Sequence, residues 1–337
     1  MFTSILVPLD GSSRAERALR VAARIAQAEG GGIVLFRALP LPLSSAPLFG
    51  QDASSEWLLE EEVASATAYL DDVTASQILR DIAVTCVVRD GDPARLILEY
   101  AQAQQVDLIV LCSHGRSNLG RWILGGVADH IVRYAPMPAL VVRAEGAQAL
   151  AARDVERLFC VLVPLDGCAL AEAAIEPAAR LAAVLAAPQP AGLHLVVIVD
   201  PFEATVRQGV PESAVVDSAR RYLIRLTDRL RAEHPQMTMN WSIQRDVDAA
   251  TGILLVAEGG EDTEGASPVG SCDLIVMTTH GRTGFLRWAL GSVAERVLHA
   301  AQLPVTVVRP RQTAPTNAAT NAASTAATTP QHHLGHE

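Results

Sequence analysis

Short apolar runs alternate along this chain with longer stretches in which apolar residues recur at helical spacing. Ile5–Leu9 and Ile33–Ala38 are runs typical of buried strands, and residues 13–28 between them have the spacing of an amphipathic helix. The pattern then predicts a helix at 56–79, a strand at 83–88, a helix at 93–104, a strand at 108–111, a helix at 127–133 and a strand at 139–142. Such alternation predicts a parallel β-sheet with helices on both faces.

The whole pattern occurs twice. The hexapeptide LVPLDG at 6–11 recurs at 162–167, and DLIV at 107–110 recurs at 273–276. The spacing between these blocks is larger in the second copy by about ten residues, which locates an insertion in Glu258–Cys272, read as an exposed loop. A duplicated unit of this length predicts two α/β modules of the same fold.

The predicted domains are residues 1–146 and 153–311, and residues 312–337 are expected to be a disordered tail. Each module ends in an apolar strand that would leave a sheet edge unpaired. We therefore expect the two final strands to cover one another in an intramolecular pseudo-dimer, with a homodimer as a further possibility.

The amino-acid composition excludes several classes of function. The chain has 337 residues, a formal net charge of −10 and no lysine, so a P-loop NTPase and lysine Schiff-base chemistry are excluded. An acidic chain without basic blocks is a poor nucleic-acid binder. Five cysteines without C-x-x-C spacing, no signal peptide and no long apolar run predict a reduced cytoplasmic protein, with neither a metal centre nor a membrane span.

An aspartate–glycine pair follows the first strand of each module: Asp10-Gly11 and Asp166-Gly167. Ligands of open parallel sheets bind beyond the carboxyl ends of the strands. A carboxylate there can accept hydrogen bonds from ribose hydroxyls or hold a metal ion, but it can equally cap the helix that follows. Position alone leaves both roles open.

A second candidate site follows the fourth strand. Glycines at the start of a helix allow a phosphate to approach free backbone N–H groups, and an arginine adds charge, although a simple helix cap after a surface loop has the same pattern. Ser292 and Glu295 have the spacing of a capping box, which predicts the start of a helix at this site; Ser13 and Glu16 predict the same for the helix after the first strand. The residues of this second site are His114, Gly115, Arg116, Gly125 and Gly126 in the first module, and His280, Gly281, Arg282, Gly291 and Ser292 in the second.

In these motifs, taken together and in order, the chain resembles the universal stress protein family in its tandem two-domain form. The resemblance covers nearly all of residues 1–311 and implies two Rossmann-like (adenine nucleotide α-hydrolase-like) domains, each with a five-stranded parallel sheet. Many family members bind ATP through a motif written G-x₂-G-x₉-G-[ST]. The resemblance thus implies that Asp10 and Asp166 meet the adenosine and that the glycine loops hold the phosphates of ATP, with or without Mg²⁺.

The chain departs from that motif at three positions. The first motif glycine is replaced by Cys112 in one module and Thr278 in the other, and Gly126 stands where Ser or Thr is expected. The second module, with Ser292, is therefore the better candidate site. A free cysteine directly after an apolar strand is more often a buried small residue than a reactive thiol, and we expect the same of Cys112.

Three classes of function stay open. The first is an ATP-binding stress-response regulator, the second a slow ATPase or related enzyme, and the third a nucleotide-free scaffold that binds proteins. The sequence offers no complete catalytic constellation, so we predict no catalytic residue and at most weak ATP hydrolysis.

Overall fold

The computed structural model describes residues 1–40, 53–113, 124–143, 157–202, 205, 209–259, 263–265, 271–279 and 290–310. The first repeat contains β1 (Ser4–Pro8), α1 (Arg17–Glu29), β2 (Gly32–Leu39), α2 (Ala53–Thr74), the 3₁₀ turn η2 (Gln77–Leu79), β3 (Ala83–Asp90), α3 (Pro93–Ala103), β4 (Leu108–Cys112), α4 (Gly126–Tyr134) and β5 (Ala139–Val142). The second contains β6 (Phe159–Leu165), α6 (Ala169–Glu172), α7 (Ile175–Ala186), β7 (Ala191–Val199), α8 (Glu212–Glu233), β8 (Thr238–Arg245), α9 (Ala249–Ala257), β9 (Thr263–Gly265), β10 (Leu274–Thr278), α10 (Ser292–Ala300) and β11 (Val305–Val308).

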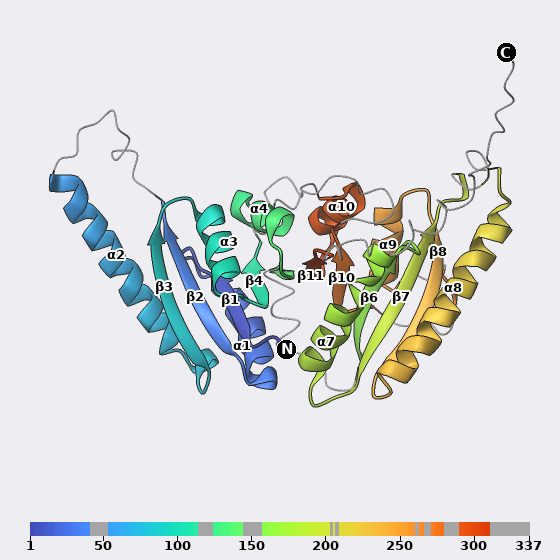
Figure 1. Cartoon of the computed structure of the whole chain (residues 1–337), viewed down its shortest axis with the longest axis horizontal. Helices are drawn as coiled ribbons and strands as arrows, with labels where there is room; N and C mark the ends of the chain where they lie inside the picture. Colours follow the sequence, from blue (N-terminus) through green and yellow to red (C-terminus); the bar gives the residue numbers. More distant parts are fainter. Residues whose placement is uncertain are drawn as a thin grey trace, which may run out of the picture.

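All the strands described belong to one sheet, in the order β3-β2-β1-β4-β5-β11-β10-β6-β7-β8-β9. Neighbours within each repeat are parallel, apart from β9, and the repeats form the two arms of a V with α4 and α10 near its centre (Figure 1). The predicted fold, a parallel α/β sheet in each repeat with helices on both faces, is confirmed.

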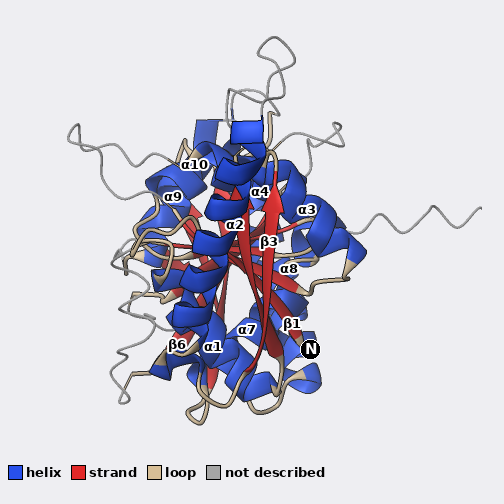
Figure 2. Ribbon diagram, turned by 90° about the vertical axis from the view of Figure 1, so that its left-hand side faces the viewer, coloured by secondary structure: helices blue, strands red, loops and turns tan. Residues whose placement is uncertain are grey.

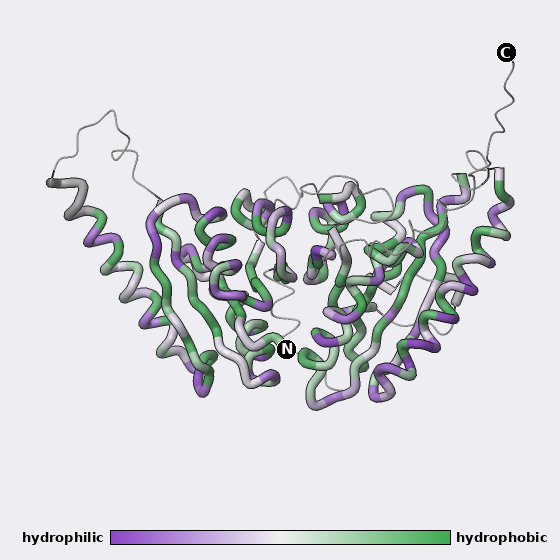
Figure 3. The backbone as a smooth tube through the Cα atoms, in the orientation of Figure 1, coloured by the Kyte–Doolittle hydropathy of each residue, from purple (hydrophilic) through white to green (hydrophobic). Residues whose placement is uncertain are grey.

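Alternating side chains of the strands form two cores, one on each face of the sheet. In β1, Ile5 and Val7 face the core under α1, α2, α7 and α8, whereas Leu6 faces the core under α3, α4, α9 and α10. Each core runs without a break through both repeats, because β5 joins β11 and α1 packs on α7. In Figure 3 the strands are accordingly coloured mainly as hydrophobic residues. Along the outer helices α2 and α8, hydrophobic and hydrophilic residues alternate. Figure 2 shows α2 crossing in front of the sheet at the β3 end.

The final strands β5 and β11 cover one another, as predicted; they pair antiparallel, with Leu140 opposite Thr306. Two arginines that follow these strands close the junction. Arg143, only 5% exposed, donates from Nη2 to the carbonyl of Leu298 near the end of α10 at 2.6 Å, and Arg309 donates to carbonyls at the end of α4. Each repeat thus places a cation against the C-terminus of the other repeat's helix, where the helix dipole favours positive charge.

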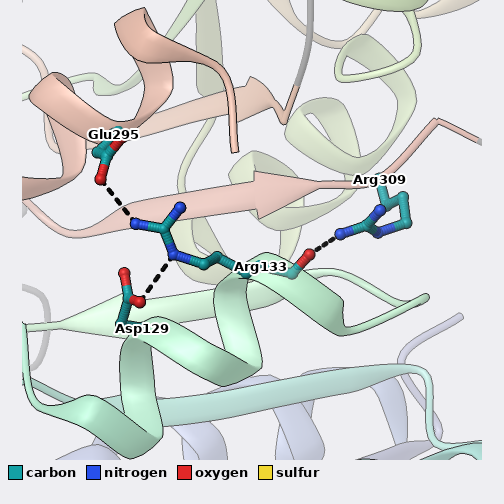
Figure 4. Close-up of polar contacts among 4 residues, drawn as sticks. All are labelled: Asp129, Arg133, Glu295 and Arg309. Carbon is teal, nitrogen blue, oxygen red and sulfur yellow. Dashed lines mark hydrogen bonds and ion pairs between the residues drawn. The ribbon is translucent and has the colours of Figure 1, made fainter. Parts of the chain in front are cut away.

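Arg133 adds an ion-pair bridge across the same junction. Figure 4 shows its guanidinium between Asp129, one turn back on α4, and Glu295 on α10, while its own carbonyl accepts from Arg309. The distances are 2.7 Å from Nε to Asp129 and 2.6 Å from Nη2 to Glu295. Hydrogen bonds to both carboxylates raise the pKa of Arg133, so its guanidinium stays charged at any physiological pH.

Two local predictions are wrong. Helix α1 begins at Arg17, and Glu16 makes no capping bond; its carboxylate instead accepts from the hydroxyl of Tyr69 on α2. At α10 the cap is Gly291, and Glu295 is drawn to Arg133. In both cases the glutamate of the predicted capping box pairs with a residue on another element, which the local pattern could not indicate.

The insertion in the second repeat, predicted as a loop, contributes a short strand to the sheet. Its residues Thr263–Gly265 form β9, which pairs antiparallel with β8 and places Thr263 opposite Gln244. Part of the insertion therefore lies toward the carboxyl end of β8. Residues 144–156, which connect the two repeats, and the predicted tail at residues 312–337 lie outside the described residues.

Candidate functional site

The strand order defines where a ligand could enter each repeat. From β1 the chain first proceeds outward through β2 and β3, then returns to β4 on the other side of β1. The carboxyl ends of β1 and β4 form the switch point at which such sheets bind ligands, and we refer to this place as the crevice of the repeat. The equivalent point of the second repeat lies between β6 and β10.

The Asp10-Gly11 turn forms one side of the first crevice. Asp10 Oδ1 accepts from the backbone N–H of Ser12 at 2.9 Å and from the Ser12 hydroxyl at 2.6 Å. Gly11 has a φ of +83°, a conformation that L side chains rarely adopt. The exposed carboxylate of Asp10 is thus held in a fixed turn rather than capping α1, which begins seven residues later, at Arg17.

The second repeat builds the same turn. Asp166 Oδ1 accepts from the backbone N–H of Cys168 at 3.0 Å, and Gly167 has the same φ of +83°. Here Cys168, and not the aspartate, caps the short helix α6. Of the two roles that the sequence left open for these aspartates, a direct helix cap is therefore not observed.

Asp10 is ionised at neutral pH. Burial raises its pKa, but the hydrogen bonds from Ser12 and the positive charge of Arg37 together outweigh burial and hold the pKa of this carboxyl below its usual value. The site therefore presents a negatively charged acceptor group to a ligand.

The other side of each crevice is the start of a helix capped by glycine. Gly125 precedes α4 and Gly291 precedes α10, both with extended backbone, and neither has a side chain that could cap the first turn. The amide of Gly291 is tied to the carbonyl of Thr279, at the end of β10, at 2.8 Å. The first-turn N–H groups of such a helix attract anions.

The two helix starts differ at their first residue. Gly126 and Ser292 are both exposed, and a Cβ added at Gly126 would meet no atom within 4 Å. The absence of a hydroxyl in the first repeat is therefore not imposed by crowding.

Cys112 and Thr278 end the fourth strand of each repeat. Cys112 is half-buried against the core, and burial raises the pKa of its thiol to about 11. A protonated thiol is a poor nucleophile, which favours packing over reactivity. Thr278 is buried, at 7% exposure.

The remaining predicted site residues, His114, Gly115, Arg116, His280, Gly281 and Arg282, lie outside the described residues. Sequence reasoning missed two others. Tyr69 donates to Glu16 at 3.0 Å, and Tyr222 donates to Glu172 at 3.0 Å in the second repeat, tying the long helix to the segment after the Asp-Gly turn. The recurrence of Glu16 as Glu172 was the only sequence signal for these two tyrosine contacts. Arg37, whose charge acts on Asp10, was also missed, and the sequence contains no signal for it.

Comparison with known proteins covers both repeats. The family model described as "Universal stress protein family" matches residues 1–143 and 160–309. A universal stress protein of Mycolicibacterium smegmatis is 26% identical over 313 residues, covering 91% of this chain and 97% of the relative. One from Thermus aquaticus is 33% identical over 144 residues, covering 42% of this chain and 100% of the relative.

Solved structures agree on the fold. The crystal structure of a universal stress protein from Archaeoglobus fulgidus aligns with a TM-score of 0.61 at 17% identity, covering 92% of this chain and 99% of that chain. A putative universal stress protein from Pseudomonas aeruginosa aligns with a TM-score of 0.57 at 19% identity, covering 92% and 94%.

Proposed function

This chain belongs to the universal stress protein family, and we propose that it is a stress-response regulator that binds ATP in the crevices described above. One observation carries the proposal: in each repeat an aspartate turn and a glycine-capped helix start flank the same switch point. The aspartates offer acceptors for nucleoside hydroxyl or amino groups, and the helix starts offer N–H groups for phosphates. Mg²⁺ would accompany the phosphates.

The proposed ligand is an adenine nucleotide, and the net charge of −10 argues against a nucleic acid. We place the protein in the cytoplasm; no helix in the part of the chain that is described could cross a membrane. We assign no catalytic residue, because the described residues around the crevices supply carboxylates but no activated nucleophile. A slow ATPase and a nucleotide-free scaffold are the competing functions.

A direct test is heat denaturation of the purified protein followed by chromatography of the released nucleotide. Recovered ATP supports the proposal, whereas a nucleotide-free protein that also fails to bind added ATP contradicts it. Asp10→Ala and Asp166→Ala, singly and together, then assign the sites: each single variant should lose one equivalent of ATP. ATP turnover that disappears with Asp166→Ala would favour the enzyme.

The second repeat should bind ATP at least as tightly as the first, because only Ser292 adds a hydroxyl to the N–H groups of the helix start. A hydrogen bond to a charged group contributes about 1.5–3 kcal/mol, which corresponds to about tenfold or more in affinity. Ser292→Gly should weaken ATP binding by this factor. The matched variant Gly126→Ser should strengthen ATP binding in the first repeat, since the position has room for a side chain.

Glu264, the acidic residue that the insertion places on β9, does not offset this difference. Strand β9 lies four strand positions from β10, or about 19 Å at the usual strand spacing. Charges separated by more than about 10 Å are largely screened at 0.1 M salt. If Ser292→Gly leaves the ATP affinity of the second repeat unchanged, the hydroxyl argument is wrong.

A further inference from the structure

The outer edge of the first repeat is an unpaired strand. β3 ends the sheet on this side, and β2 is its only neighbour among the described strands. β3 is eight residues long, and Figure 2, which looks onto this end of the molecule, shows it beside α2 rather than behind it. An edge of this kind exposes a row of backbone N–H and C=O groups that can pair with a further strand.

The second repeat covers the corresponding edge. There β9 pairs antiparallel with β8 and leaves an outer edge of only three residues. Proteins protect longer edge strands with charges, proline or bulges. Residues 83–88 contain neither a charged residue nor a proline; valine and threonine favour strands, and Thr85 and Cys86 are exposed. The first repeat thus keeps a long edge that favours pairing with a further strand.

Charged residues stand at both ends of this edge. Arg80 and Asp81 precede β3, and Arg89 and Asp90 are its last two residues. All four are exposed, and none forms an ion pair within the described part of the chain. Each end therefore has one positive and one negative side chain, an arrangement that is complementary to the same edge running in the opposite direction.

We propose that this edge is a dimer interface, at which β3 pairs antiparallel with β3 of a second copy of the chain. The twofold axis passes through Thr85, which lies opposite its own counterpart. Arg89 then lies opposite Asp81 of the second copy. Asp90 lies opposite its Arg80, and the symmetry forms each of these pairs twice. Moving the axis by one residue loses both pairs, so charge selects this register.

Helix α2 adds an apolar contact beside the strand. Thr74 on α2 lies 3.3 Å from the Cys86 sulfur on β3, which identifies the side of the helix that faces this strand. Val63 and Thr67 precede Thr74 on that side at helical spacing. Both are exposed, and Val63 is one of the larger apolar side chains left in solvent, at 38% exposure. A second copy seated on β3 would cover them.

Sedimentation velocity of the full chain across a dilution series tests the proposal. The wild-type chain should be a dimer that dissociates on dilution. Thr85→Lys brings two ammonium groups together on the axis and should give a monomer, which circular dichroism should show to be folded because Thr85 is exposed. The matched control is Ile224→Lys on α8, at the opposite end of the molecule (Figure 1); it adds the same charge at an exposed position and should leave the dimer intact.

The charge pairs test the register. Arg80→Asp places two carboxylates opposite each other on both sides of the axis and should weaken the dimer by about tenfold or more. Adding Asp90→Arg reverses the second charge of each pair and should restore the dimer. If the double variant stays as weak as Arg80→Asp alone, the charge pairing is wrong.

Cross-linking locates the axis. In a Cys86→Ser chain, Thr85→Cys should form a disulfide between two copies in air, because residues directly opposite on antiparallel strands are close enough for this bond. Arg89→Cys in the same chain should not, since its counterpart lies at the other end of the paired strands. A chain that is monomeric at every concentration, or a dimer that Thr85→Lys leaves intact, overturns the proposal. None of these outcomes depends on nucleotide binding.

Discussion

Acidification should destabilise this protein through one buried histidine. His194 on β7 is 4% exposed, and its Nε2 lies 2.7 Å from the Ser242 hydroxyl on β8. Burial lowers the pKa of His194 from its ordinary 6.5 to about 4. The folded protein therefore holds this imidazole neutral at pH values where the unfolded chain already protonates it.

The sign and size of the effect follow from this difference. Well above pH 6.5 the histidine is neutral in both the folded and the unfolded state, so it does not change the free energy of unfolding. Between pH 6.5 and 4 the unfolded chain binds a proton that the folded chain does not, so stability falls as pH falls. A shift of this size corresponds to about 3 kcal/mol in total, and to about 2 kcal/mol at pH 5.

Urea unfolding at pH 7 and pH 5, followed by tryptophan fluorescence, measures the loss; Trp241 on the neighbouring strand β8 is a local reporter. The control is the double variant His194→Leu with Ser242→Ala, which replaces the polar pair by apolar groups and leaves no partner unpaired. The wild-type protein should lose about 2 kcal/mol more than the variant between the two pH values. Equal losses would show that His194 is not held neutral.

Three further outcomes test other parts of the structure. Gly11→Ala should cost about 1–2 kcal/mol of stability because of its left-handed backbone, and more than Gly167→Ala, since only Gly11 is crowded by a neighbouring guanidinium; equal melting temperatures would contradict the contact. Arg143→Met should lower the free energy of unfolding by about 1–3 kcal/mol, because the carbonyl of Leu298 loses its donor, and an unchanged melting curve would refute that role. Deleting residues 312–337, which have almost no large apolar side chains, should leave the melting temperature nearly unchanged, and a drop of several degrees would count against their predicted disorder.

The sequence predicted the strands best, because buried parallel strands are nearly continuous apolar runs. Residues 139–142 were predicted as a strand and form β5 with the same bounds. The duplication predicted the pairing of β5 with β11. It also placed Asp10 and Asp166 at strand ends, since a repeated motif after a strand has a fixed position in the fold.

Contacts between distant segments could not be predicted. The capping-box spacing at Glu16 was correct as a pattern, yet Tyr69, 53 residues away, took its carboxylate. Arg37 looked like an ordinary polar residue in an apolar strand, and only the sheet register brings it to Gly11. The edge strand β9 was missed because three residues paired to a neighbour leave no periodicity of their own.

The antiparallel joint between β5 and β11 also has a consequence for assembly. Two separate domains that meet through their final strands are held by mass action, so dilution separates them and any two compatible copies can exchange. Here one chain supplies both partners, and their effective concentration is independent of how much protein the cell makes. Within one chain the two unlike repeats are therefore matched one to one, so the crevice of one repeat can change while its partner repeat stays the same.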